Sequence, residues 1–91
     1  MDRRTQARAL VESALAEVET ELQTPRHALC PEQLGTCRDT LRGYLAALDG
    51  GELPPRRDRP EPLCRIVAER WPFDLPLAAL VLRAERAWRN V

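Results

Sequence analysis

The sequence predicts an all-helical fold of four helices. Apolar residues recur at intervals of three and four in four segments of the chain, and prolines and glycines fall between these segments. No segment alternates apolar and polar residues over the length of a strand, and β-branched residues are few. With 91 residues, we expect residues 1–91 to form one helical domain with a small core.

The first predicted helix covers about residues 2–23. Asp2 or Thr5 can cap its start. Pro25 ends it, because a residue that precedes proline is held out of the α region. Its apolar stripe consists of Ala7, Val11, Ala14, Leu15, Val18 and Leu22.

The second predicted helix covers about residues 31–49. Pro31 suits the first helical position, and Gly50-Gly51 ends the helix by accepting positive φ. A short loop joins this helix to the first one, so we expect the two to form a long antiparallel hairpin. Its stripe consists of Leu34, Cys37, Leu41, Leu45 and Leu48, with Tyr44 beside it.

Residues 50–62 form a Pro/Gly/Arg-rich loop with four prolines and two glycines. We expect an ordered loop within the domain, since neither flanking half can bury much alone. Its arginines are candidate anion contacts. A solvated loop with Asp58 and Glu61 as counter-charges is the favoured interpretation, because no aromatic residues lie among the arginines. These candidates are Arg56, Arg57 and Arg59.

Two shorter helices are predicted at about residues 61–71 and 75–90. Leu63, Ile66, Val67 and Trp71 form the stripe of the first. We expect Asp74 to cap the second, with Pro76 in its first turn. Its main stripe consists of Leu77, Leu80, Val81, Ala84, Trp88 and Val91. We expect Trp71 and Trp88 to pack where the two helices meet.

The 75–90 helix has more apolar surface than one stripe. A helix that is apolar on most sides is either central in the fold or shared with another chain. We expect it to bind a second copy of the chain as a homodimer, another protein, or both. The predicted interface consists of Leu75, Ala78, Ala79, Leu82, Arg86 and Arg89.

The charge is balanced in total but unevenly placed. The chain has fourteen arginines and fourteen acids, and it has no lysine. Residues 1–24 hold five acids and three arginines, while residues 53–91 hold eight arginines and five acids. The two parts suit packing against each other, within one chain or across a dimer. The zero net charge disfavours a nucleic-acid footprint, which is normally basic.

His27, Cys30, Cys37 and Cys64 have the residue types of a zinc site, but only the first two lie at a usual spacing. A nucleophilic Cys30 with His27 as its base lacks an identifiable third residue. We therefore expect free thiols, no metal, no cofactor and no catalytic residue. The polar start and the longest apolar run, Leu77–Leu82, indicate neither a signal peptide nor a membrane span, so we expect a cytoplasmic protein.

Three functions remain open. The favoured one is a protein–protein interaction module, such as a helical adaptor, small chaperone, immunity-type inhibitor or regulatory subunit. The first alternative is a small helical enzyme that binds an anionic metabolite with arginines; an arginine-lined polar cavity would support it. The second is a nucleic-acid-binding protein with a helix-turn-helix in residues 61–90. The apolar start of the last helix argues against that alternative.

Overall fold

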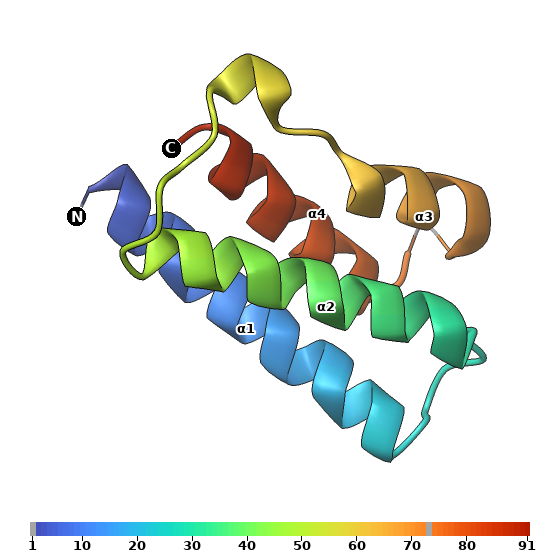
Figure 1. The fold of residues 1–91 in the computed structure, drawn as a ribbon. Helices are drawn as coiled ribbons and strands as arrows, with labels where there is room; N and C mark the ends of the chain where they lie inside the picture. The colour runs from blue at the N-terminus through green and yellow to red at the C-terminus, as the bar shows by residue number, and fades with distance from the viewer. Residues whose placement is uncertain (1, 73) are drawn as a thin grey trace.

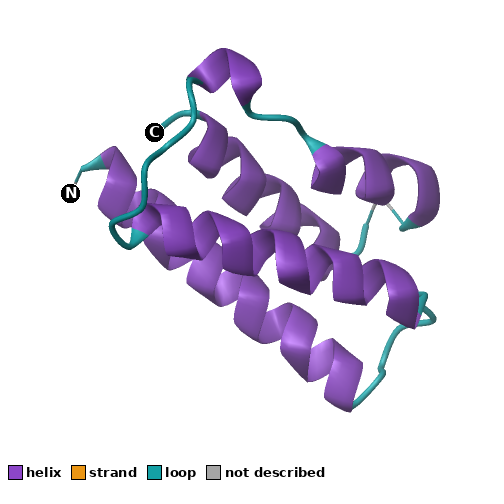
Figure 2. Cartoon of the chain, in the orientation of Figure 1, coloured by secondary structure: helices purple, strands orange, loops and turns teal. Residues whose placement is uncertain are grey.

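The computed structural model describes residues 2–72 and 74–91. These residues form α1 (Arg3–Gln23), α2 (Pro31–Leu48), the 3-10 helix η1 (Arg56–Asp58), α3 (Pro62–Arg70) and α4 (Pro76–Arg89), without a strand. Figure 2 shows helices joined by loops throughout this part of the chain. The all-helical prediction is therefore confirmed, and each predicted helix boundary lies within one residue of the observed one.

The four α-helices share one core (Figure 1). α1 and α2 form the predicted antiparallel hairpin, α4 packs along α1, and α3 packs on α4 and α2. Most residues of the predicted stripes belong to this core, whereas Leu22, Leu45, Ile66, Leu80 and Val91 are only partly buried against it. The three fully buried side chains of greatest volume are Leu41, Leu63 and Glu85.

α4 is the helix whose apolar surface exceeded one stripe. Leu75 and Ala78 are 8% and 2% exposed, so the chain's own helices cover them. These two residues were predicted at an interface, and that placement is wrong because they belong to the core. Ala79 remains exposed and Leu82 is half-buried. One face of α4 is therefore buried in the core. The apolar surface that α4 leaves exposed is smaller than the sequence predicted.

The predicted caps have different outcomes. The Asp2 side chain accepts a hydrogen bond from the backbone N–H of Thr5 at 2.7 Å, which confirms the cap of α1. The prediction for Asp74 is wrong, because α4 begins at Pro76 and its N-cap is Leu75. Leu75 has the extended backbone that a residue before proline requires, with φ −74° and ψ 121°. Asp74 thus lies one residue too early to cap the helix.

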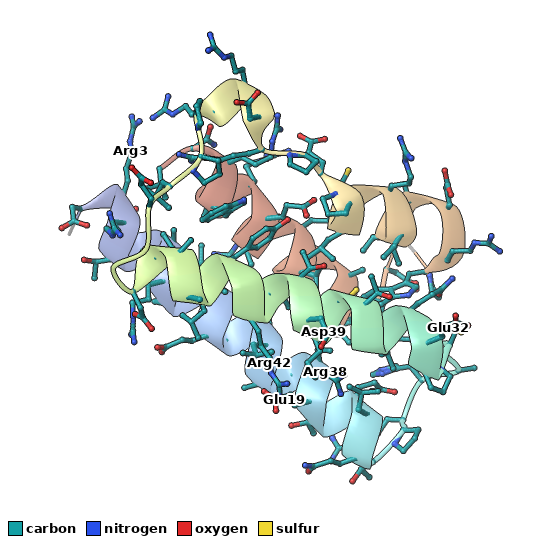
Figure 3. The ribbon with its side chains drawn as sticks, in the orientation of Figure 1. Arg3, Glu19, Glu32, Arg38, Asp39 and Arg42 are labelled. Atoms are coloured by element: carbon teal, nitrogen blue, oxygen red, sulfur yellow. The ribbon has the colours of Figure 1, made fainter. Side chains whose placement is uncertain are left out.

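Gly50 ends α2 with a φ of 131°, as the glycine pair predicted. The loop that follows contains η1. In the part of the chain that the structure describes, no helix has the length and apolar composition to cross a membrane. The surface of the hairpin is polar, and Figure 3 shows Arg42 of α2 near Glu19 of α1, where the two side chains form an ion pair at 3.3 Å.

Candidate functional site

A buried carboxylate joins α2, α3 and α4. Glu85 lies on the inner face of α4 and is 1% exposed. Its Oε2 accepts hydrogen bonds from the Tyr44 hydroxyl at 2.7 Å and the Leu63 N–H at 3.0 Å, and its Oε1 accepts one from the Cys64 N–H at 2.8 Å. α3 has no cap from its own N-cap residue, Glu61. Glu85 supplies that cap from another helix, where the positive end of α3 favours a negative charge.

The groups around Glu85 are held in their neutral forms. Burial raises the pKa of Tyr44 well above its ordinary value, and the hydrogen bond to Glu85 adds to this shift. Burial also raises the pKa of the Cys37 thiol to about 12, and the charge of Glu85 adds to it. A phenol and a thiol in this state are poor bases and nucleophiles near neutral pH. The cluster therefore has the character of a structural network.

Arg59 lies beside this network and is 6% exposed. Its guanidinium donates hydrogen bonds to the carbonyls of Pro54 at 2.8 Å and Trp88 at 2.9 Å, and to that of Val91 at 3.1 Å. The guanidinium carbon also lies 5.2 Å from the centre of the Trp88 ring. Trp88 in turn stacks on Tyr44 of α2, with the ring centroids 4.6 Å apart.

Arg59 differs from the predicted solvated loop because it is buried, whereas Arg56 is exposed. Arg56 donates to the carbonyl of Asn90 at 2.8 Å, so both arginines bind carbonyls at the C-terminal end of α4. A cation is favourable at that end of a helix. Because these donors are already engaged, the three candidates do not form a free anion-binding cluster. Arg57 lies exposed on η1.

A surface depression with a volume of about 740 Å³ lies along α3. A smaller one of about 120 Å³ adjoins it on α4. Both are lined by Glu61, Cys64 and Arg89. We call the two together the α3–α4 groove. Its other lining residues are Arg59, Pro60, Pro62, Arg65, Ile66, Ala68, Glu69, Leu82, Glu85 and Arg86.

The groove brings together three of the predicted interface residues. Leu82, Arg86 and Arg89 all line its smaller part. Arg89 forms an ion pair with Glu61 and donates to the Arg59 carbonyl at 3.1 Å. Ala79 is exposed on α4 and does not line the groove.

A second buried carboxylate orders the loop between α1 and α2. Glu21 is 5% exposed and accepts hydrogen bonds from the backbone N–H groups of Arg26 and His27, each at 2.9 Å. It also lies 2.9 Å from the His27 Nδ1. His27 is thus occupied by a loop contact.

The histidine and the cysteines do not assemble into a site. Cys37 is in the core, Cys30 is exposed before α2, and Cys64 is half-buried in α3. Among residues 2–72 and 74–91, no three His, Cys, Asp or Glu side chains lie close enough together to hold a metal ion.

The Glu21 contacts predict a loss of stability in acid. Burial of the carboxyl opposes its ionisation, but the hydrogen bonds from His27 and Arg26 dominate and lower the pKa of Glu21 below its ordinary value of 4.5. The contribution of Glu21 to the free energy of unfolding is therefore complete above its ordinary pKa, and it is lost as the pH falls through the lowered pKa. We expect the free energy of unfolding to fall less between about pH 7 and about pH 3 in Glu21→Gln than in the wild type. Urea melts at both pH values measure this, and an equal fall in both proteins would contradict it.

The thiols are expected to react in the order of their exposure. Iodoacetamide should modify Cys30 first and Cys64 more slowly, while Cys37 should react only after unfolding. Timed mass spectrometry of digested protein gives the order of modification. Separately, elemental analysis of the intact, unmodified protein tests the expectation of no bound zinc. Early modification of Cys37 in folded protein would show that the core is open at α2.

The positions of these two buried acids in the sequence were informative, but the apolar periodicity alone did not show that the acids are buried. Glu85 and Glu21 occupy positions on or beside the apolar stripes of their helices, three or four residues from buried neighbours such as Val81 and Val18. An acid at such a position is either exposed at the stripe edge or buried with partners. Their partners are the Tyr44 hydroxyl and the α3 amides in one case and the 24–30 loop in the other.

No protein-family model matches the chain, and no curated protein is significantly similar to it.

Proposed function

We propose that this chain is a protein–protein interaction module without catalytic activity of its own, and that it binds its partner through the α3–α4 groove. The groove itself supports this proposal most directly. It exposes the partly buried apolar residues Ile66 and Leu82 beside arginines, where α3 and α4 pack against each other. Apolar surface with a polar rim is typical of binding surfaces.

The groove fits an anion-binding enzyme less well. Arg59 and Arg89 donate to backbone carbonyls, and Arg89 also pairs with Glu61. Arg65 is the remaining arginine of the larger depression, and Glu69 lines the same depression. A clamp on a small anion needs several free and convergent donors.

The helix-turn-helix alternative is also disfavoured by the start of α4. Leu75, Leu77 and Ala78 are buried within the chain. A recognition helix needs its first turns on the surface, where polar side chains reach base edges.

A homodimer through α4 stays part of this proposal. We also propose a cytoplasmic location, because the three free thiols remain reduced in that compartment. Burial of Leu75 and Ala78 leaves Leu82 and Ala79 as its apolar contacts on α4. Sedimentation of the wild type at micromolar concentration tests for this homodimer, and a concentration-independent monomer would remove it from the proposal.

The module itself is tested by affinity capture from its native cell with matched baits. We expect the wild type and Arg26→Glu to retain the same partner, and Arg86→Glu and Leu82→Arg to lose it. Arg26 and Arg86 are both exposed and undergo the same charge change, but only Arg86 lines the groove. Circular dichroism of Leu82→Arg checks that this variant is folded. Equal retention by Arg26→Glu and Arg86→Glu, or no retained partner, would contradict the proposed function.

A further inference from the structure

The free charges of the α3–α4 groove are mainly positive. Glu85 accepts hydrogen bonds from three donors and is covered, while Glu61 pairs with Arg89. Arg59 is buried against the carbonyls of α4. Within the described residues, Arg65 and Arg86 have no ion pair. Two lining acids in this part of the chain also have none, and of these Glu85 is buried while Glu69 is exposed.

The groove also has apolar lining residues on both helices. Arg65 and Ile66 lie on α3, and Leu82 and Arg86 lie one turn apart on α4. Each helix therefore contributes one apolar side chain and one free cation to the groove, α3 to its larger part and α4 to its smaller part. Pro62 adds apolar surface at the start of α3.

We propose that the α3–α4 groove binds an acidic amphipathic segment of another protein, whose apolar side chains contact Ile66 and Leu82 and whose carboxylates pair with Arg65 and Arg86. This inference rests on the proposed function and specifies the chemistry of the partner. Arginine suits the role because its planar guanidinium binds a carboxylate through two hydrogen bonds. A helix that places such residues three and four positions apart presents both kinds of side chain on one face.

A second copy of this chain fits the groove less well. A stable dimer buries about 800 Å² on each partner. Burial of Leu75 and Ala78 in the core removes much of the apolar surface that α4 offered for it. Nucleic acid also fits less well, because the groove is lined by Ile66, Leu82, Ala68 and prolines, and none of the described residues that line it is aromatic and could stack on a base.

The experiment selects peptides from a phage-displayed library of helical sequences against the whole chain. We expect the selected peptides to combine Glu or Asp with Leu, Ile or Phe at helical spacing. A fluorescein-labelled selected peptide should bind about tenfold or more weakly to the double variant Arg65→Glu/Arg86→Glu. Binding should be unchanged in the matched double variant Arg26→Glu/Arg57→Glu, whose arginines are exposed and lie outside the groove. Replacing the peptide's acids with Lys should abolish binding.

Several results would overturn this proposal. Selected peptides without acids, or no selected peptide at all, would show that the free arginines do not choose the partner. Equal binding by both double variants would place the site elsewhere. Binding of a labelled DNA duplex that is lost in Arg65→Glu/Arg86→Glu, or a wild-type dimer that the same variant dissociates, would assign the groove to nucleic acid or to a second copy. If affinity capture still depends on Arg86 while the peptides fail, this inference is wrong and the proposed function stands.

Discussion

Replacing Glu85 with Ala is expected to lower the free energy of unfolding by about 3–5 kcal/mol, because buried donors that lose their acceptor cost about 1–3 kcal/mol each. Three donors depend on this carboxylate: the Tyr44 hydroxyl and the N–H groups of Leu63 and Cys64. The two amides belong to the first turn of α3, so the start of that helix should lose its cap. Guanidinium denaturation followed by circular dichroism measures the loss.

Two further variants separate the lost hydrogen bonds from the lost volume at Glu85. Glu85→Gln keeps the side-chain volume and one acceptor oxygen, but its amide nitrogen would face a donor, so we expect a smaller loss than for Ala. Glu69→Ala removes an exposed acid from α3 and should change stability by less than about 0.5 kcal/mol. If Glu85→Ala were as stable as Glu69→Ala, the buried network would not hold α3 in place.

Arg59→Ala is expected to lower the free energy of unfolding by about 2–3 kcal/mol, because hydrogen bonds from a charged group contribute about 1.5–3 kcal/mol and water can replace part of them. The variant removes the contacts to the carbonyls of Pro54, Trp88 and Val91 and uncovers the Trp88 ring. The 50–62 loop should then detach from the end of α4. Thermal and urea melts report the stability, and hydrogen exchange of residues 50–62 reports the loop.

Arg57→Ala is the matched control for Arg59. Both arginines lie in the same loop, but Arg57 is exposed and Arg59 is 6% exposed. We expect Arg57→Ala to leave stability within about 0.5 kcal/mol of the wild type. Arg59→Lys should fall between the two, since an ammonium keeps the charge but cannot reach several carbonyls with a planar fork. An Arg59→Ala protein as stable as Arg57→Ala would mean that the loop is held by its prolines alone.

The sequence alone determined the helices and most of their ends. Apolar residues at intervals of three and four define the faces of α1, α2 and α4, and residues near a helix end act within about four positions of it. The cap by Asp2 and the positive φ of Gly50 follow from such local rules. The wrong prediction of Asp74 as the cap also has a local cause, because Pro76 holds Leu75 in an extended conformation and makes Leu75 the N-cap.

The sequence predicted the site only in part. Leu82, Arg86 and Arg89 lie in the α3–α4 groove as members of the predicted interface, whereas Leu75 and Ala78 are covered. Helical periodicity shows which residues share a face, but it does not show which neighbour covers that face. The extent of the free surface on α4 therefore depended on where α1, α2 and α3 pack.

Only the tertiary structure decided the partners of the buried charges. Glu85 lies 41 positions from Tyr44 and 22 from Leu63, and Arg59 lies 29 positions from Trp88. A charged side chain is stable inside a protein only when such partners surround it, and no interval in the sequence states that they will meet. Packing of α3 and the 50–62 loop against α4 brings these groups together, and the same packing forms the groove to which we assign the function.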